Sequence, residues 1–297
     1  MRFPSGLRAL NHRDFRLFWS GQLISLCGRW MQSVGQSWLV LELTNSPIKL
    51  GIVGALQFAP ILVLSIVAGA IADRLPKRPL IVLTQLVLML PAFSLAALIW
   101  SGQVRYWHVA VGACVIGIVN ALDMPARQSL IAELVGRDDL VNAIALNSAM
   151  FNAARVVGPA IGGLLILRYG VALAFFLNGV TFLAVVAALL AMRVEGFRRA
   201  HQETTIREEI ADGLRYAIGS PLISLILSLV LAVSVFVINH TVLVPLLARE
   251  VLGQGVEGFG FLMAVLGGGA VVGALALSGF GRGQPSLAPG VAPALVL

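Results

Sequence analysis

The sequence predicts an all-α protein that crosses a membrane several times, and three observations lead to this fold class. Only 12% of the 297 residues are charged, about half the share found in soluble domains. The mean hydropathy is high, at +0.91. Eight apolar runs each extend over 20 or more residues. At 1.5 Å per residue, each run is long enough to cross a hydrocarbon core of about 30 Å.

The apolar runs divide into a group of six, a polar connection and a final pair. Six runs lie within 1–192 and predict an N-terminal six-helix bundle. The connection at 193–221 contains IREEIADGLRYAIGSP, whose apolar residues at helical spacing predict a short amphipathic helix on the membrane surface. Residues 281–297 are rich in Gly and Pro and predict a loop or tail. The expected spans are 17–41, 48–71, 79–100, 107–127, 141–167, 171–192, 222–247 and 257–280.

Lys and Arg gather in every second connection. Of the 21 such residues, fifteen lie in the N-terminal segment and in the connections on its side, and four lie in connections on the other side. The other two, Arg29 and Arg155, lie inside predicted spans. Because cytoplasmic loops of membrane proteins carry the excess of Lys and Arg, we expect a multi-pass protein with a cytoplasmic N-terminus.

The composition argues against other classes of function. The formal charge is +7, but no basic cluster is interleaved with aromatic residues, so we expect no nucleic-acid partner. Cys27 and Cys114 lie in apolar runs and offer neither a disulfide framework nor a metal site. The sequence contains no HExxH, no GxSxG and no Walker-type loop. We therefore expect no enzymatic activity, no cofactor and no metal, with the lipid bilayer as the surrounding partner.

A stripe of polar residues crosses the first span. Its members recur at spacings of 3, 4, 3 and 4, which places them on one helical face. Polar groups inside a membrane are expensive, so this face is predicted to point away from lipid. It either lines a path for a small-molecule substrate or packs by hydrogen bonding against neighbouring helices. The stripe consists of Gln22, Ser25, Arg29, Gln32 and Gln36.

The fourth span carries a pair of opposite charges near its end. Asp123 and Arg127 are four residues apart and can pair on one helical face, with Pro125 between them. Two interpretations are open, an ion pair that tightens the helix end and a gate that opens during a transport cycle. Asp123 is also a candidate for coupling to protons.

Two later spans carry further candidates. In the fifth span, Asn152 and Arg155 share a face, and Gly158 with Gly162 predicts close helix approach. In the seventh span, Asn239 and His240 form a polar cluster, and His240 either couples to protons or packs by hydrogen bonding. Arg29, Gln32 and Gln36 complete the expected substrate path.

The connection between the second and third spans reads GAIADRLPKRPL. Arg74, Lys77 and Arg78 are expected to hold it on the cytoplasmic side, and Gly69 is expected to let the flanking helices approach closely.

This connection resembles the signature loop of the major facilitator superfamily. The pattern G-x-x-x-D-R-x-x-K-R maps onto Gly69, Asp73, Arg74, Lys77 and Arg78. The run at Gly158, Pro159, Gly162 and Gly163 resembles the exporter-associated motif of helix five. Three longer stretches resemble the branch that contains the enterobactin exporter and macrolide efflux proteins: GRWMQSVGQSWLVLELTNSP, MPARQSLIAELVGRDDLVNAIALNSAMFNAARVVGPAIGG and VLVPLLAREVLG. Pro76 and Ala154 depart from the two motifs.

The resemblance implies a fold of twelve helices in two bundles, with the transport path between them. Residues 222–280 would then be the first two helices of the second bundle, which agrees with a weak repeat between 48–71 and 257–280. Helices nine to twelve would be needed in the same chain or from a partner chain. Asp73 would dock on the eleventh helix, and Asp123 and Arg127 would complete the cytoplasmic gate.

The function implied by the resemblance is secondary-active efflux across a bacterial inner membrane. The transporter would work by alternating access, would couple to protons and would carry a siderophore or a drug-like amphipathic compound. Two alternatives remain open, a truncated chain that inserts without transporting, and a membrane receptor or regulator that binds a ligand without flux.

Overall fold

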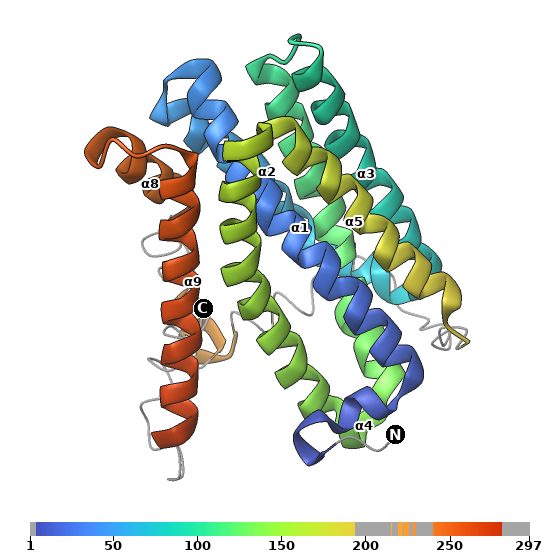
Figure 1. Ribbon diagram of the computed structural model, residues 1–297. Helices are drawn as coiled ribbons and strands as arrows, with labels where there is room; N and C mark the ends of the chain where they lie inside the picture. Colours follow the sequence, from blue (N-terminus) through green and yellow to red (C-terminus); the bar gives the residue numbers. More distant parts are fainter. Residues whose placement is uncertain are drawn as a thin grey trace.

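The fold is described from a computed structural model, which describes residues 4–193 and 240–280 together with positions 215, 219–221, 223–225, 228 and 229. This part of the chain is helical and contains no strand, as the predicted all-α fold requires. The helices are α1 (Arg13–Thr44), α2 (Pro47–Arg74), α3 (Lys77–Trp100), α4 (Tyr106–Tyr169), α5 (Val171–Ala191), α8 (His240–Leu246) and α9 (Val256–Phe280). The short segment η1 (Ser5–Asn11) precedes α1, and η2 (Leu247–Val251) follows α8 (Figure 1).

The reversal between α1 and α2 follows from its residues. Asn45 closes α1 in the left-handed conformation with φ 46°, which asparagine tolerates better than most residues. Ser46 then accepts a hydrogen bond from the backbone N–H of Lys49, and Pro47 takes the first position of α2. A serine cap followed by proline is a preferred helix start, so two helices join across two residues.

The connection expected at 128–140 is instead almost wholly helical. α4 runs over 64 residues, and only Gly136 leaves the helical conformation, with φ 68° and ψ −176°. Because a positive φ favours glycine, Gly136 is where the chain turns back. α4 therefore has a first arm, 106–135, and a second arm, 137–169, which meet at the lower end of the view in Figure 1. Helical structure thus continues past the apolar stretch into the polar residues beside the turn.

Four segments of the described residues are long and apolar enough to cross a membrane: 47–65 within α2, α3, α4 and α5. At 64 residues, α4 is long enough to cross the membrane twice, once on each side of Gly136. The expected span at 222–247 and the amphipathic helix before it lie largely outside the described residues, and the tail at 281–297 lies wholly outside them. α9 begins at Val256, one residue before the expected start.

Glycines let the second arm of α4 approach two helices closely. A Cβ built on Gly158 would lie 2.5 Å from the Cβ of Trp30 on α1. A Cβ on Gly163 would lie 3.1 Å from the Cα of Gly260 on α9, which runs beside this arm in Figure 1. The small-residue face expected at Gly158 and Gly162 therefore packs on α1, since Gly162 is similarly close to Met31.

The role expected of Gly69 is wrong. A Cβ at Gly69 would meet no described atom within 4 Å, so this glycine brings no described helices together. The close approach of α2 instead occurs at Gly117 on the first arm of α4, where a Cβ would lie 2.4 Å from the backbone oxygen of Gln57. α2 thus packs mainly against α4 rather than against α3, its neighbour in sequence.

Two large apolar clusters form the core. One contains residues such as Phe15, Phe18 and Leu130 and lies at the end of the bundle where α1 begins, α2 and α5 end and α4 turns. We name this the basic end, because Arg8, Lys77 and Arg78 lie there. The other cluster lies toward the opposite end and includes Val34, Phe175 and Phe259.

Candidate functional site

A layer of polar side chains separates the two apolar clusters. Along α1, the basic-end cluster ends at Phe18 and the opposite cluster begins at Met31. Along α3, Thr84 and Gln85 fall between Ile81 and the small apolar cluster at Leu88. Because the same order recurs on neighbouring helices, the polar side chains occupy one depth of the bundle. This polar layer consists of Gln22, Ser25 and Arg29 on α1, Thr84 and Gln85 on α3, and Asp123 and Arg127 on α4.

Asp123 is the centre of the layer and is fully buried. Its Oδ1 accepts hydrogen bonds from the hydroxyl of Thr84 at 2.5 Å and from Nε2 of Gln85 at 3.0 Å. Its Oδ2 accepts a hydrogen bond from Nε of Arg127, with which it forms an ion pair. A buried carboxylate is tolerated only when it is paired and hydrogen-bonded, and three donors from two helices meet that condition here.

This geometry places the pair away from a helix end, because α4 continues past Arg127 to Val135 before the turn. Pro125 lies between the two charges without interrupting the helix. The pair therefore lies about two turns before the break at Gly136, and α3 takes part in a way that the spacing alone did not indicate.

Arg29 brings a third charge from α1. It interacts electrostatically with both Asp123 and Arg127. Its Nε is buried and has no hydrogen-bond partner among the described residues, as is also true of the hydroxyl of Ser25. The layer thus joins two groups that were expected separately, the α1 stripe and the charge pair of the fourth span.

The outer part of the stripe hydrogen-bonds to neighbouring helices. Oε1 of Gln32 accepts from Nδ2 of Asn178 on α5 at 2.6 Å. Nε2 of Gln36 donates to Oε1 of Gln57 on α2 at 3.0 Å. Gln32, Gln36 and Gln22 are all buried. For Gln32 and Gln36 these contacts favour the interpretation that the stripe packs by hydrogen bonding against neighbouring helices, since each amide joins two helices.

The remaining path candidates lie in different settings. Arg155 is buried, and its guanidinium lies over the Trp30 ring, 6.0 Å from the ring centre. Nδ2 of Asn152 donates to the backbone oxygen of Ser148 on its own helix. Asn239 lies outside the described residues, and for His240 only the helical backbone is described.

The signature loop lies at the basic end. Lys77 is buried, and its Nζ donates to three backbone oxygens at the end of α2. Arg78 donates to the backbone oxygen of Leu190 at the end of α5. The side chains of Asp73 and Arg74 are exposed. Asp73 and Lys77 also line a cavity of about 470 Å³ with Glu133 and Arg137.

Sequence reasoning missed four residues that complete these contacts. Thr84, Gln85, Asn178 and Gln57 each lie singly or as a pair within a long apolar run and form no stripe of their own. The available signal was their polarity at membrane depth, which alone marks a residue that requires a partner.

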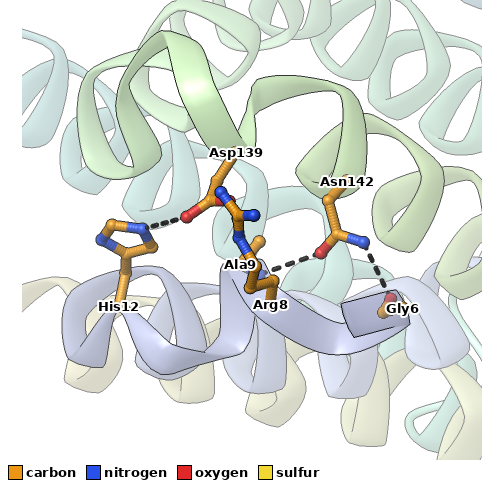
Figure 2. A network of polar contacts seen from close by, with 6 residues as sticks. All are labelled: Gly6, Arg8, Ala9, His12, Asp139 and Asn142. Atoms are coloured by element: carbon orange, nitrogen blue, oxygen red, sulfur yellow. Dashed lines mark hydrogen bonds and ion pairs between the residues drawn. The ribbon is translucent and has the colours of Figure 1, made fainter. Parts of the chain in front are cut away.

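A second polar network fastens the start of the chain to the second arm of α4 (Figure 2). Nε of Arg8 and Nε2 of His12 lie 2.7 and 2.8 Å from the two carboxylate oxygens of Asp139. Asn142 accepts from the backbone N–H of Ala9 and donates to the backbone oxygen of Gly6. The hydrogen bonds of His12, and then those of Arg8 with both positive charges, hold the pKa of Asp139 below its usual range, although partial desolvation opposes them.

Comparison with known proteins decides the family. A family model described as transmembrane secretion effector, of the major facilitator type, matches residues 4–283. The chain belongs to this family. The resemblance to the major facilitator superfamily is therefore confirmed.

Members of the family with curated functions are similar over most of this chain. The staphyloferrin A transporter of Staphylococcus aureus is 27% identical, over 88% of this chain and 66% of its own length. The enterobactin exporter of Shigella flexneri is 26% identical, over 89% of this chain and 62% of its own. The multidrug efflux pump Tap of Mycolicibacterium fortuitum is 29% identical, over 66% and 50%. The chain thus spans two thirds or less of the length of these relatives.

A solved structure shows the same fold. A bacterial homologue of the human lysosomal transporter Spinster, in an inward-facing and unoccupied conformation, superposes with a TM-score of 0.66 at 18% identity. The match covers 94% of this chain and 65% of that chain.

Proposed function

We propose that these residues belong to a secondary-active exporter that is driven by protons. The observation that carries the proposal is the fully buried Asp123, held between Arg127 on its own helix and Thr84 and Gln85 on α3. A carboxylate at membrane depth is costly, and such groups serve proton relays in transporters. Arg29 on α1 interacts electrostatically with the same carboxylate.

A proton on Asp123 would change the charges of the whole layer. In the ionised state Asp123 offsets one of the two guanidinium charges, whereas in the protonated state both remain uncompensated. Protonation therefore changes the electrostatic interactions between α1, α3 and α4. Through this change the proton gradient would alter how the three helices pack.

The substrate proposed is a small amphipathic compound of the siderophore or drug class. The names of the relatives support this, because they include transporters of two siderophores and a multidrug pump. We propose that Arg29, Arg155 and the buried amide of Gln22 line its path, with the signature loop as gate, whereas Gln32 and Gln36 hold neighbouring helices together. We propose that the basic end lies in the cytoplasm of a bacterial cell, which the excess of basic residues supports.

The test is efflux driven by an imposed pH gradient. The complete gene product that contains these residues is reconstituted in proteoliposomes, and release of a siderophore or a fluorescent drug is followed. Asp123→Asn is expected to abolish the response to the pH gradient while leaving downhill exchange. Glu42→Gln, an exposed acid on α1, serves as the control and should leave the response unchanged. A full response in Asp123→Asn would contradict the proton site, and ligand binding without flux in the unaltered protein would favour a receptor.

A further inference from the structure

Arg127 uses only part of its guanidinium. The side chain is 9% exposed, and Nε bonds to Asp123, but neither Nη1 nor Nη2 has a hydrogen-bond partner among the described residues. These two nitrogens carry four N–H donors. Native proteins leave few buried donors without acceptors, because a buried donor that has lost its water and gained no acceptor destabilises the fold.

The charges of the polar layer do not balance either. Among the described residues of the layer, Arg29 and Arg127 are positive and Asp123 is negative. One positive charge is therefore in excess, in a region where Asp123 is fully buried and Arg127 nearly so. The Nε of Arg29 adds another buried donor without an acceptor. Both arginines therefore lack hydrogen-bond acceptors, and together they lack one compensating negative charge.

One kind of group meets both needs. Water offers acceptors to the free N–H groups but leaves the extra charge uncompensated. A carboxylate or a related oxyanion offers planar acceptors that match a guanidinium and also brings one negative charge.

We propose that Nη1 and Nη2 of Arg127, with Arg29, form a binding site for a single oxyanion group of carboxylate type. This inference rests on the proposed function in one respect, that the oxyanion is part of the transported compound. Asp123 already binds Nε of the same guanidinium. Its negative charge therefore repels the bound oxyanion and lowers the affinity of the site for it.

The test compares two probes of the same shape and different charge. Binding of labelled benzoate and of neutral benzamide to the purified full chain in detergent is measured by equilibrium dialysis at neutral pH. Benzoate is expected to bind and benzamide not. Arg29→Gln is expected to weaken benzoate binding roughly tenfold or more, and Arg29→Lys, which keeps the charge, should weaken it less. Arg168→Gln, an exposed arginine at the end of α4, is the matched control without effect.

Asp123→Asn supplies a prediction of opposite sign. Removal of the competing negative charge is expected to tighten benzoate binding, a result that damage to the fold would not produce. Equal binding of benzoate and benzamide, or benzoate binding indifferent to Arg29→Gln, would overturn the site. Charge-dependent binding without flux in proteoliposomes would count against the proposed function and leave the site standing. Flux with benzoate binding unaffected by these substitutions would count against the site alone.

Discussion

Lys77 shows how one residue joins two helices at the basic end. The last carbonyls of a helix have no partner within it, and a cation there is also favoured by the helix dipole. Nζ of Lys77, the first residue of α3, donates to the backbone oxygens of Ala72, Asp73 and Leu75 at 2.6, 2.9 and 3.2 Å. All three N–H groups of the ammonium are therefore used to close α2.

Lys77→Met should consequently destabilise the protein. Methionine keeps the length of the side chain but leaves three backbone oxygens without their charged donor, which should cost about 2 kcal/mol. The measurement is the midpoint of thermal unfolding in detergent. Lys49→Met is the control, because Lys49 is exposed and makes a cation–π contact with Tyr106 at 5.3 Å, which is worth about 0.5 kcal/mol. Equal losses in the two variants would show that Lys77 has no special role.

At the scale of residues, the sequence could predict which groups carry charge at membrane depth but not how they meet. Arg29 and Asp123 stood out because ionised side chains are rare within apolar runs. Their interaction across α1 and α4 depends on helix rotation and register, which periodicity within one helix cannot supply. Thr84 and Gln85 lacked any periodic signal, so their role as donors to Asp123 required the packed structure.

At the scale of elements, the packing of α4 depends on glycines that face different neighbours. Gly117 packs against α2, Gly158 against α1 and Gly163 against α9. In each case a Cβ built on the glycine would lie about 3 Å or less from a backbone atom of the neighbouring helix. Sequence spacing identified Gly158 and Gly162 as a close-packing face. It also suggested Gly69, wrongly, because a glycine in an apolar run is equally compatible with open space.

Gly117→Ala and Gly69→Ala should therefore have opposite effects on stability. At Gly117 the new methyl would lie 2.4 Å from the backbone oxygen of Gln57, so α2 and α4 would be pushed apart at a cost of about 1–3 kcal/mol. At Gly69 the methyl meets no described atom within 4 Å, so only the gain in helix propensity, up to about 1 kcal/mol, remains. Thermal unfolding of the two variants in detergent separates these effects. A destabilisation at Gly69 as large as that at Gly117 would contradict the packing.

Apolar run length indicated where the described helices lie, but not where they end. Hydrophobicity placed a connection at 128–140, whereas α4 stays helical there except at Gly136. Polarity does not by itself end a helix, since a polar residue such as Arg137 has nearly the helix propensity of leucine, so polarity marks where a helix leaves the membrane rather than where it ends.

At the scale of the whole molecule, polar networks fix the bundle at two depths. The polar layer joins α1, α3 and α4 between the apolar clusters, and the network of Figure 2 ties the chain start to α4 at the basic end. The second network lies beside Gly136, where α4 is not helical, so η1 braces the turn between its two arms.

The brace is expected to depend on pH through Asp139. Because Arg8 and His12 hold the folded pKa of this carboxyl below its usual range, the network contributes fully above the usual carboxyl pKa. The contribution is lost as the pH falls through the lowered folded value, since a neutral carboxyl no longer pairs with the two bases. Hydrogen exchange of the amides in η1, corrected for the intrinsic dependence of exchange on pH, measures this release. Asp139→Asn should leave η1 unprotected at neutral pH as well, whereas Asp138→Asn, its exposed neighbour, should exchange like the unaltered protein. Protection of η1 that survives in Asp139→Asn at neutral pH would assign the brace to Asn142, whose two hydrogen bonds to Ala9 and Gly6 carry no charge.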